Sequence, residues 1–125
     1  GRPIAVWESG AILLYLADKT GQLIPNARAK RYKTLAWVFF QMSAIGPLFG
    51  QPGFFLRYGG KDFEDKRPRQ CFVDESKRLL GVLDRQLEGR NWMVGDYSIA
   101  DIATLGWVNA LVESYAAGDI LSLSN

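Results

Sequence analysis

Gly95-Asp96-Tyr97-Ser98-Ile99-Ala100-Asp101-Ile102 decides the fold, because this segment is a capping box followed directly by a long apolar run. In such a box the Ser98 side chain accepts from a backbone N–H in the first turn of a helix, and the Asp101 side chain accepts from the N–H of Ser98. The sequence therefore predicts a helix from Ile99 to about Tyr115. Its apolar residues occupy several faces, so we expect a buried helix (Ile102, Leu105, Trp107, Val108, Leu111 and Val112).

Three further helices are predicted upstream from apolar periodicity and from helix breakers. The first opens at Ser9 and ends at Gly21, the second begins near Ala27, and the third runs from residues 63–68 to Gly89. Glycine just after a last turn and proline in a first turn are the usual end and start signals. The expected fold class is therefore all-α, a helical bundle.

The second helix is apolar around much of its circumference, which predicts a central position. Gly46-Pro47 should kink or break it, because proline lacks an N–H and crowds the preceding turn. From Gly50 to Gly60, helix breakers flank an aromatic cluster, so we interpret this segment as a functional loop. Residues 1–7 have the apolar content of the end of an edge strand that has no visible partner.

The composition indicates one compact domain, with 125 residues of which 48% are hydrophobic. The sequence has no run of about 18 consecutive apolar residues, the length needed to span a membrane, and no signal peptide is recognisable. We therefore expect a cytoplasmic protein without a membrane partner. Cys71 is the single cysteine and histidine is absent. This excludes an intrachain disulfide, a His-dependent catalytic triad and a Cys-rich or His-rich metal site, so we expect no metal.

A basic cluster near the start of the second helix raises the question of nucleic acid. No nucleic-acid-binding motif accompanies this cluster, so we interpret it as a solvated helix face (Arg28, Lys30, Arg31 and Lys33). We expect no nucleic-acid partner.

The pair Glu8-Ser9 is the candidate binding site. A helix that opens at Ser9 offers free backbone N–H groups and a positive dipole end to a carboxylate, while Glu8 can face an ammonium group. An amino acid carries both groups. The alternative is an ordinary helix start, with Ser9 as N-cap, Glu8 as a solvated acid and a buried face (Ile12, Leu13 and Leu16).

Three separated motifs, which follow one another along the chain in the expected order, resemble the glutathione transferase family. Glu8-Ser9-Gly10-Ala11-Ile12 resembles the start of the third helix of these enzymes, and the Gly95–Ile102 segment resembles the folding signature of their helical domain. Ala36–Met42, followed by Ile45–Gln51, resembles the nu-class, disulfide-reductase-like branch. The similarity covers roughly residues 4 to 112.

The resemblance implies a helical bundle like the carboxy-terminal domain of this family, over residues 25–125 in truncated form. Residues 1–24 would be the last strand and helix of a thioredoxin-like domain that is otherwise absent. It also implies that Glu8 binds the ammonium and Ser9 the carboxylate of the γ-glutamyl end of glutathione. Ser98 and Asp101 would have a structural role, and no catalytic residue is assigned, because the groups that activate the thiol would belong to the absent domain.

By the same resemblance, four residues would lie on the side of the second substrate (Phe40, Gln51, Phe54 and, as an anion contact, Arg78). The alternative for the two phenylalanines is core packing. For Arg78 the alternative is a surface pair with Asp74 or Glu75. Pro52-Gly53 stands where the branch usually has polar or histidine residues, and this departure weakens the expectation of a substrate contact there.

Two function classes follow. The first is glutathione-dependent thiol transfer or disulfide reduction, with glutathione as substrate bound weakly or not at all, and with no activity from this chain alone. The second is a non-catalytic helical module that forms a homo-oligomer through exposed apolar surface, with Leu13, Leu14 and Leu16 as contributors. A third arrangement is half of a two-chain enzyme whose partner is a separate thioredoxin-like half.

Overall fold

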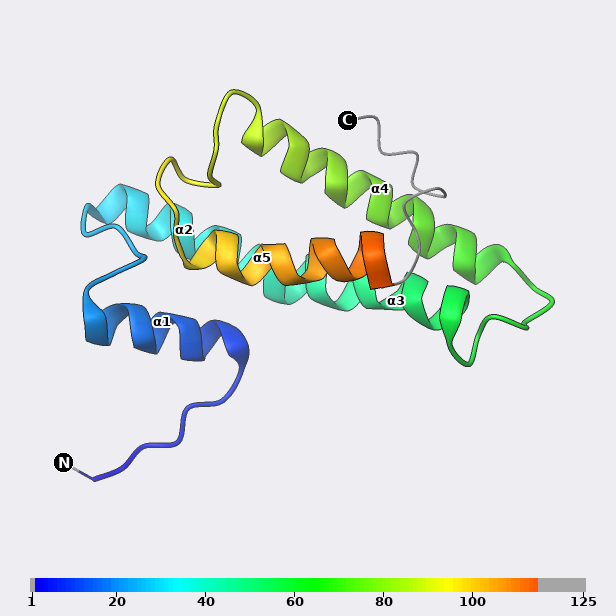
Figure 1. The fold of residues 1–125 in the computed structure, drawn as a ribbon, viewed down its shortest axis with the longest axis horizontal. Coiled ribbons are helices and arrows are strands. Elements are labelled where there is room, and N and C mark those ends of the chain that lie inside the picture. Colours follow the sequence, from blue (N-terminus) through cyan, green and yellow to red (C-terminus); the bar gives the residue numbers. More distant parts are fainter. Residues whose placement is uncertain (1, 115–125) are drawn as a thin grey trace.

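The structure, a computed structural model, describes residues 2–114, and in this part of the chain every regular element is helical, as predicted (Figure 1). The α-helices are α1 (Ser9–Thr20), α2 (Arg28–Phe40), α3 (Gly46–Arg57), α4 (Arg67–Leu87) and α5 (Ile99–Asn109). Two π-helical turns, η1 (Gln41–Ile45) and η2 (Ala110–Ser114), continue α2 and α5. No helix between residues 2 and 114 has the length and apolar content needed to cross a bilayer.

The core lies between α5, the continuous segment formed by α2, η1 and α3, and the long helix α4. Its most deeply buried side chains come from all three parts, each less than 2% exposed (Ile45, Phe49, Val73, Leu79, Ile99 and Leu111). In Figure 1, α5 crosses in front of α2 and α3, while α4 and α1 lie on opposite sides of it. The central position predicted for the second helix is confirmed, although Phe39 on its outer face is 65% exposed.

The capping box predicted at Ser98 and Asp101 is present. The Ser98 Oγ accepts from the Ala100 N–H at 3.3 Å, and the Asp101 carboxylate accepts from the Ser98 N–H at 2.9 Å. The same carboxylate also accepts from the Met93 N–H at 2.9 Å, so it fixes the loop that leads into α5. The middle of this connection and its last residue are thereby anchored to one side chain.

The sequence predicts a loop over Gly50–Gly60, and this prediction is wrong for residues 50–57, because α3 continues to Arg57; residues 58–60 lie outside a helix. Pro52 and Gly53 are buried inside the helix, so their tertiary packing outweighs their low helix propensity. The Phe55 ring stacks on Phe72 of α4 with centroids 5.7 Å apart, which holds α3 against α4.

The break predicted near Gly46-Pro47 takes the form of the π-helical turn η1, which ends immediately before Gly46. Because proline falls in the first turn of α3, its missing N–H is not required there. The helix therefore changes its hydrogen-bond pattern at this point and continues.

The strand predicted for residues 1–7 is not formed over residues 2–7, which carry no strand in the structure. A strand needs a neighbour to pair its backbone N–H and C=O groups, and none lies beside this segment among the described residues. The helix predicted from Ser9 is confirmed, and it ends at Gly21 in the left-handed conformation, with φ 66°.

Candidate functional site

The first turn of α1 presents free backbone donors. The first backbone hydrogen bond of the helix runs from the Ile12 N–H to the Glu8 carbonyl at 2.9 Å, so the N–H groups of Ser9, Gly10 and Ala11 have no partner within the helix. No side chain in the described part of the chain caps this end. These donors and the helix dipole together favour an anion.

Glu8 precedes the helix in a strained conformation, with φ 68° and ψ 126°. A positive φ is uncommon for a residue with a side chain and costs on the order of 1–3 kcal/mol. Ser9 is the first helical residue, so the alternative that made it an ordinary N-cap is wrong. The buried face of that alternative is found only in part, since Leu13 packs partly buried against the core while Ile12 is 40% and Leu16 48% exposed.

Met42 of η1 holds the first turn of α1 in place. The Ser9 hydroxyl donates to the Met42 Sδ at 3.7 Å, and thioether sulfur is a weak acceptor. Gly10 is buried, and a Cβ atom at this position would lie 3.2 Å from three atoms of the Met42 side chain. The close approach of α1 to η1 therefore depends on glycine at position 10.

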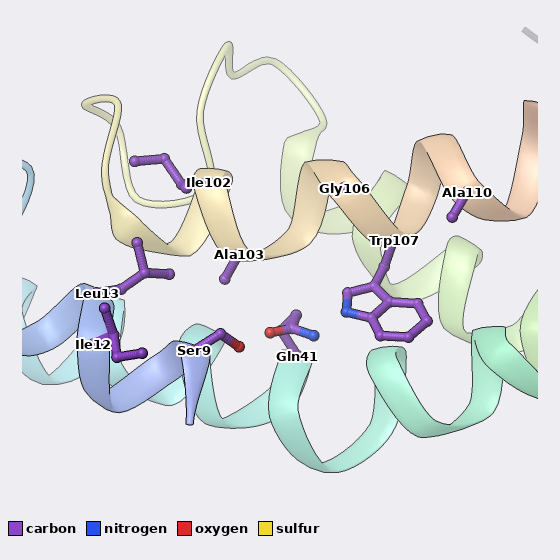
Figure 2. Close-up of a pocket in the computed structure, with 9 residues that line it drawn as sticks. All are labelled: Ser9, Ile12, Leu13, Gln41, Ile102, Ala103, Gly106, Trp107 and Ala110. Carbon is purple, nitrogen blue, oxygen red and sulfur yellow. The ribbon is translucent and has the colours of Figure 1, made fainter. Parts of the chain in front are cut away.

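A hollow of about 600 Å³ lies beside this turn, between α1, η1 and α5. Figure 2 shows Ser9 and Gln41 on one side of it and the residues of α5 on the other. Its lining carries no charged side chain (Ser9, Ile12, Leu13, Gln41, Ile102, Ala103, Gly106, Trp107 and Ala110). Ser9 therefore belongs both to the free helix end and to the hollow.

Gln41 was not predicted as a site residue. Its side chain is 2% exposed, and its Oε1 has no hydrogen-bond partner. Gly46 leaves room for the amide, since a Cβ atom at Gly46 would lie 3.0 Å from the Gln41 Nε2. The signal in the sequence was a single amide within an apolar helical run, directly after Phe39-Phe40.

The structure does not bring Phe40, Gln51 and Phe54 to this hollow. Phe40 packs partly buried against the core and meets the Trp37 ring edge-to-face at 5.4 Å. Gln51 is exposed on α3, and Phe54, 41% exposed, belongs to an aromatic cluster at the end of α3 with Phe55.

Arg78 lies on α4 and donates two hydrogen bonds to Glu75, at 2.8 and 2.7 Å. These hydrogen bonds are the main reason that the pKa of Glu75 is lowered and that of Arg78 raised. Arg78 therefore forms a surface pair with Glu75.

Within the described residues, no three Asp, Glu, Cys or His side chains gather closely enough to hold a metal ion.

Comparison with known proteins gives consistent relatives. No protein-family model matches the chain. The disulfide-bond oxidoreductase YfcG of Escherichia coli is 42% identical over 111 residues, which are 88% of this chain and 51% of YfcG. The disulfide-bond oxidoreductase YghU of the same organism is 44% identical, over 88% of this chain and 38% of YghU.

Solved structures agree with these relatives. The glutathione transferase of Pseudomonas putida, solved with one glutathione disulfide bound per subunit, superposes with a TM-score of 0.97 and 58% identity, over 99% of this chain and 54% of that protein. The glutathione transferase of Burkholderia graminis, solved with two glutathione molecules per subunit, gives a TM-score of 0.94 and 60% identity, over 98% and 52%.

This chain spans about half the length of most of the relatives described above. Sequence identity above 40% together with nearly complete superposition excludes a chance likeness of helical bundles. The chain is therefore a homologue of the glutathione transferases, with the fold of their carboxy-terminal helical domain.

Proposed function

We propose that this chain supplies the helical half of a glutathione-dependent thiol transferase or disulfide reductase. The observation that carries the proposal is the uncapped first turn of α1, with Glu8 and Ser9 at its start, in a fold shared with transferases solved with glutathione bound. The γ-glutamyl carboxylate would accept from the free N–H groups and from the Ser9 hydroxyl, which now donates only to a thioether. Glu8 would take the ammonium group.

In this reaction a glutathione thiolate attacks one sulfur of a disulfide, and the other sulfur leaves as a thiolate. A second glutathione thiolate then attacks the glutathione sulfur of the mixed disulfide, the remaining substrate sulfur leaves as a second thiolate, and glutathione disulfide is produced. The ligands named for the Pseudomonas putida and Burkholderia graminis proteins, one glutathione disulfide and two glutathione molecules, are the product and the reactants of such a cycle.

Neither Glu8 nor Ser9 as placed here activates a thiol. The proposal assigns activation to donors in the half of the protein that the relatives have beyond the match, whether in the same polypeptide or in a separate chain. Two charge-assisted contacts contribute about 1.5–3 kcal/mol each before the cost of association, so binding by this chain alone is millimolar or weaker and turnover is absent.

A thiol-conjugation and disulfide-reduction assay tests the proposal on a fusion of the unmatched half of the Pseudomonas putida transferase to this chain. Glu8→Gln and Ser9→Ala should each raise KM for glutathione about tenfold or more, as expected for loss of one charged contact. The matched controls are Glu64→Gln and Ser43→Ala, which alter exposed residues elsewhere. Equal KM values in all four variants would contradict the assignment.

Self-association without catalysis is the second candidate. Ile4, Trp7 and Leu16 are 71%, 76% and 48% exposed, and such apolar surface favours a protein partner. Leu13 and Leu14 pack partly against the core and contribute less. Sedimentation should show a homo-oligomer that dissociates on dilution, and a strict monomer at high concentration would exclude this function.

A cytoplasmic location, where exposed Cys71 stays reduced, is part of the enzymatic proposal.

A further inference from the structure

The end of the Met42 side chain is fixed against the first turn of α1. A Cβ atom at Gly10 would lie 3.2 Å from each of the Met42 Cγ, Sδ and Cε atoms, so these three atoms pack directly against the glycine. Gly10 is buried, and Met42 belongs to the π-helical turn η1 and is half-buried. This packing holds the sulfur atom of Met42 beside Ser9, the residue that precedes the glycine.

The Met42 sulfur is the acceptor of the Ser9 hydroxyl, and this contact is exposed to solvent. The Ser9 Oγ lies 3.7 Å from the Met42 Sδ, and a thioether is a weak acceptor. A serine hydroxyl carries one proton, so it donates to one acceptor at a time. When the γ-glutamyl carboxylate binds, the Ser9 hydroxyl has to leave the sulfur and turn to the carboxylate. Because the bond to sulfur is weak, this exchange costs little.

A stronger acceptor at the same place would retain the Ser9 hydroxyl. Methionine sulfoxide supplies one, because oxidation converts the apolar thioether into a polar group with a sulfoxide oxygen. Hydrogen peroxide is the oxidant: a lone pair of the Met42 sulfur attacks one peroxide oxygen, the O–O bond breaks, and the products are the sulfoxide and one water molecule. The sulfur loses two electrons and the peroxide gains them. Sulfoxide reductases reverse the modification.

The two methionines of the chain differ in their access to an oxidant. Met42 is half-buried and its contact with Ser9 is exposed, whereas Met93 is only 3% exposed. We propose that Met42 is an oxidation site that regulates glutathione binding. Its thioether releases the Ser9 hydroxyl to the γ-glutamyl carboxylate, and its sulfoxide retains that hydroxyl and lowers the affinity. This regulation rests on the proposed function, which assigns Ser9 to the carboxylate.

Oxidation of the Cys71→Ser chain with dilute hydrogen peroxide tests the proposal, since this variant lacks the exposed thiol that would also react. Peptide mass spectrometry should find the added oxygen on Met42 before it appears on Met93. The peroxide is then removed, and the chain is titrated with reduced glutathione. The backbone amide signals of residues 9–11 should need about fivefold more glutathione for half of their shift than in the untreated chain, the effect of one neutral hydrogen bond.

Two further variants in the same background separate retention of the Ser9 hydroxyl from other effects of oxidation. Met42→Leu keeps a similar volume without the sulfur, so its affinity should stay within about twofold of the untreated chain and should not respond to peroxide. Ser9→Ala should bind glutathione more weakly, and oxidation of Met42 should leave its remaining affinity unchanged, because no hydroxyl is left to retain.

Equal affinity before and after oxidation of Met42, an equal loss on oxidation in Ser9→Ala, or reaction of Met93 ahead of Met42 would overturn the proposal. A loss of affinity in peroxide-treated Met42→Leu would also overturn it, because another group would then be responsible. If the untreated chain shows no response to glutathione at residues 9–11, the proposed function fails and this regulation fails with it. A response that oxidation leaves unchanged overturns the regulation alone.

Discussion

The Gln41 side-chain amide lies in the space that Gly46 leaves empty one turn later, and a Cβ atom at Gly46 would be 3.0 Å from the Gln41 Nε2. This arrangement buries the amide while its Oε1 has no donor. Gln41 and Gly46 together therefore place a buried polar group in the wall of a hollow that has no charged side chain.

Gln41→Leu should stabilise the unfused chain by about 1 kcal/mol, because it removes an unsatisfied buried acceptor and keeps a similar volume. Gln51→Leu, at an exposed position of α3, is the control and should change stability by less than about 0.5 kcal/mol. Urea unfolding of the two variants measures the difference. A destabilised Gln41→Leu would mean that the amide already has a partner in solution.

Gly106→Ala should raise stability by about 1 kcal/mol, because glycine is unfavourable inside a helix and the added methyl group meets no atom within 4 Å. Gly46→Ala should lack this gain, because its methyl group would press on the Gln41 amide and on Trp107. Thermal unfolding of both variants tests the contrast, and equal gains would show that the amide is not held beside Gly46.

Glu8→Gly should be more stable than Glu8→Ala by about 1 kcal/mol, since both remove the side chain and only glycine relieves the strain of a positive φ. Denaturant unfolding of the two variants in parallel gives this difference directly. If alanine proved the more stable of the two, Glu8 would not be held at a positive φ.

Asp101→Ala should cost about 1–2 kcal/mol, because the carboxylate accepts from the N–H groups of both Ser98 and Met93. Asp101→Asn retains one acceptor oxygen and should lose less. The denaturation midpoint is the measurement, and an unchanged midpoint in the alanine variant would show that the Asp101 cap does not contribute to stability.

Local signals were sufficient for the helix ends. The capping box at Ser98 and the left-handed Gly21 depend on residues a few positions apart, so the sequence specifies them without knowledge of the tertiary structure. The helix through Pro52 could not be predicted in this way, because burial of Pro52 and the stacking of Phe55 on Phe72 come from contacts with distant segments. The same holds for the strand expected at residues 1–7, whose formation requires a neighbour.

The candidate site shows the same division. Glu8 and Ser9 are proposed as site residues from their motif alone, whereas the burial of the Gln41 amide depends on the approach of α1, η1 and α5, which no local pattern encodes. The residues expected on the side of the second substrate lie elsewhere on the bundle, since Arg78 is paired with Glu75 on α4 and Phe54 packs with the aromatic residues that follow it. Their role remains a proposal.

The central claim is that the first turn of α1 holds the γ-glutamyl end of glutathione, and an NMR titration of the unfused chain with reduced glutathione tests it most directly. The account predicts that the backbone amide signals of Ser9, Gly10 and Ala11 shift progressively at about millimolar glutathione, that Ser9→Ala weakens the response, and that Ser43→Ala leaves it unchanged. Unshifted amides at these three positions, or equal shifts in the two variants, would contradict it.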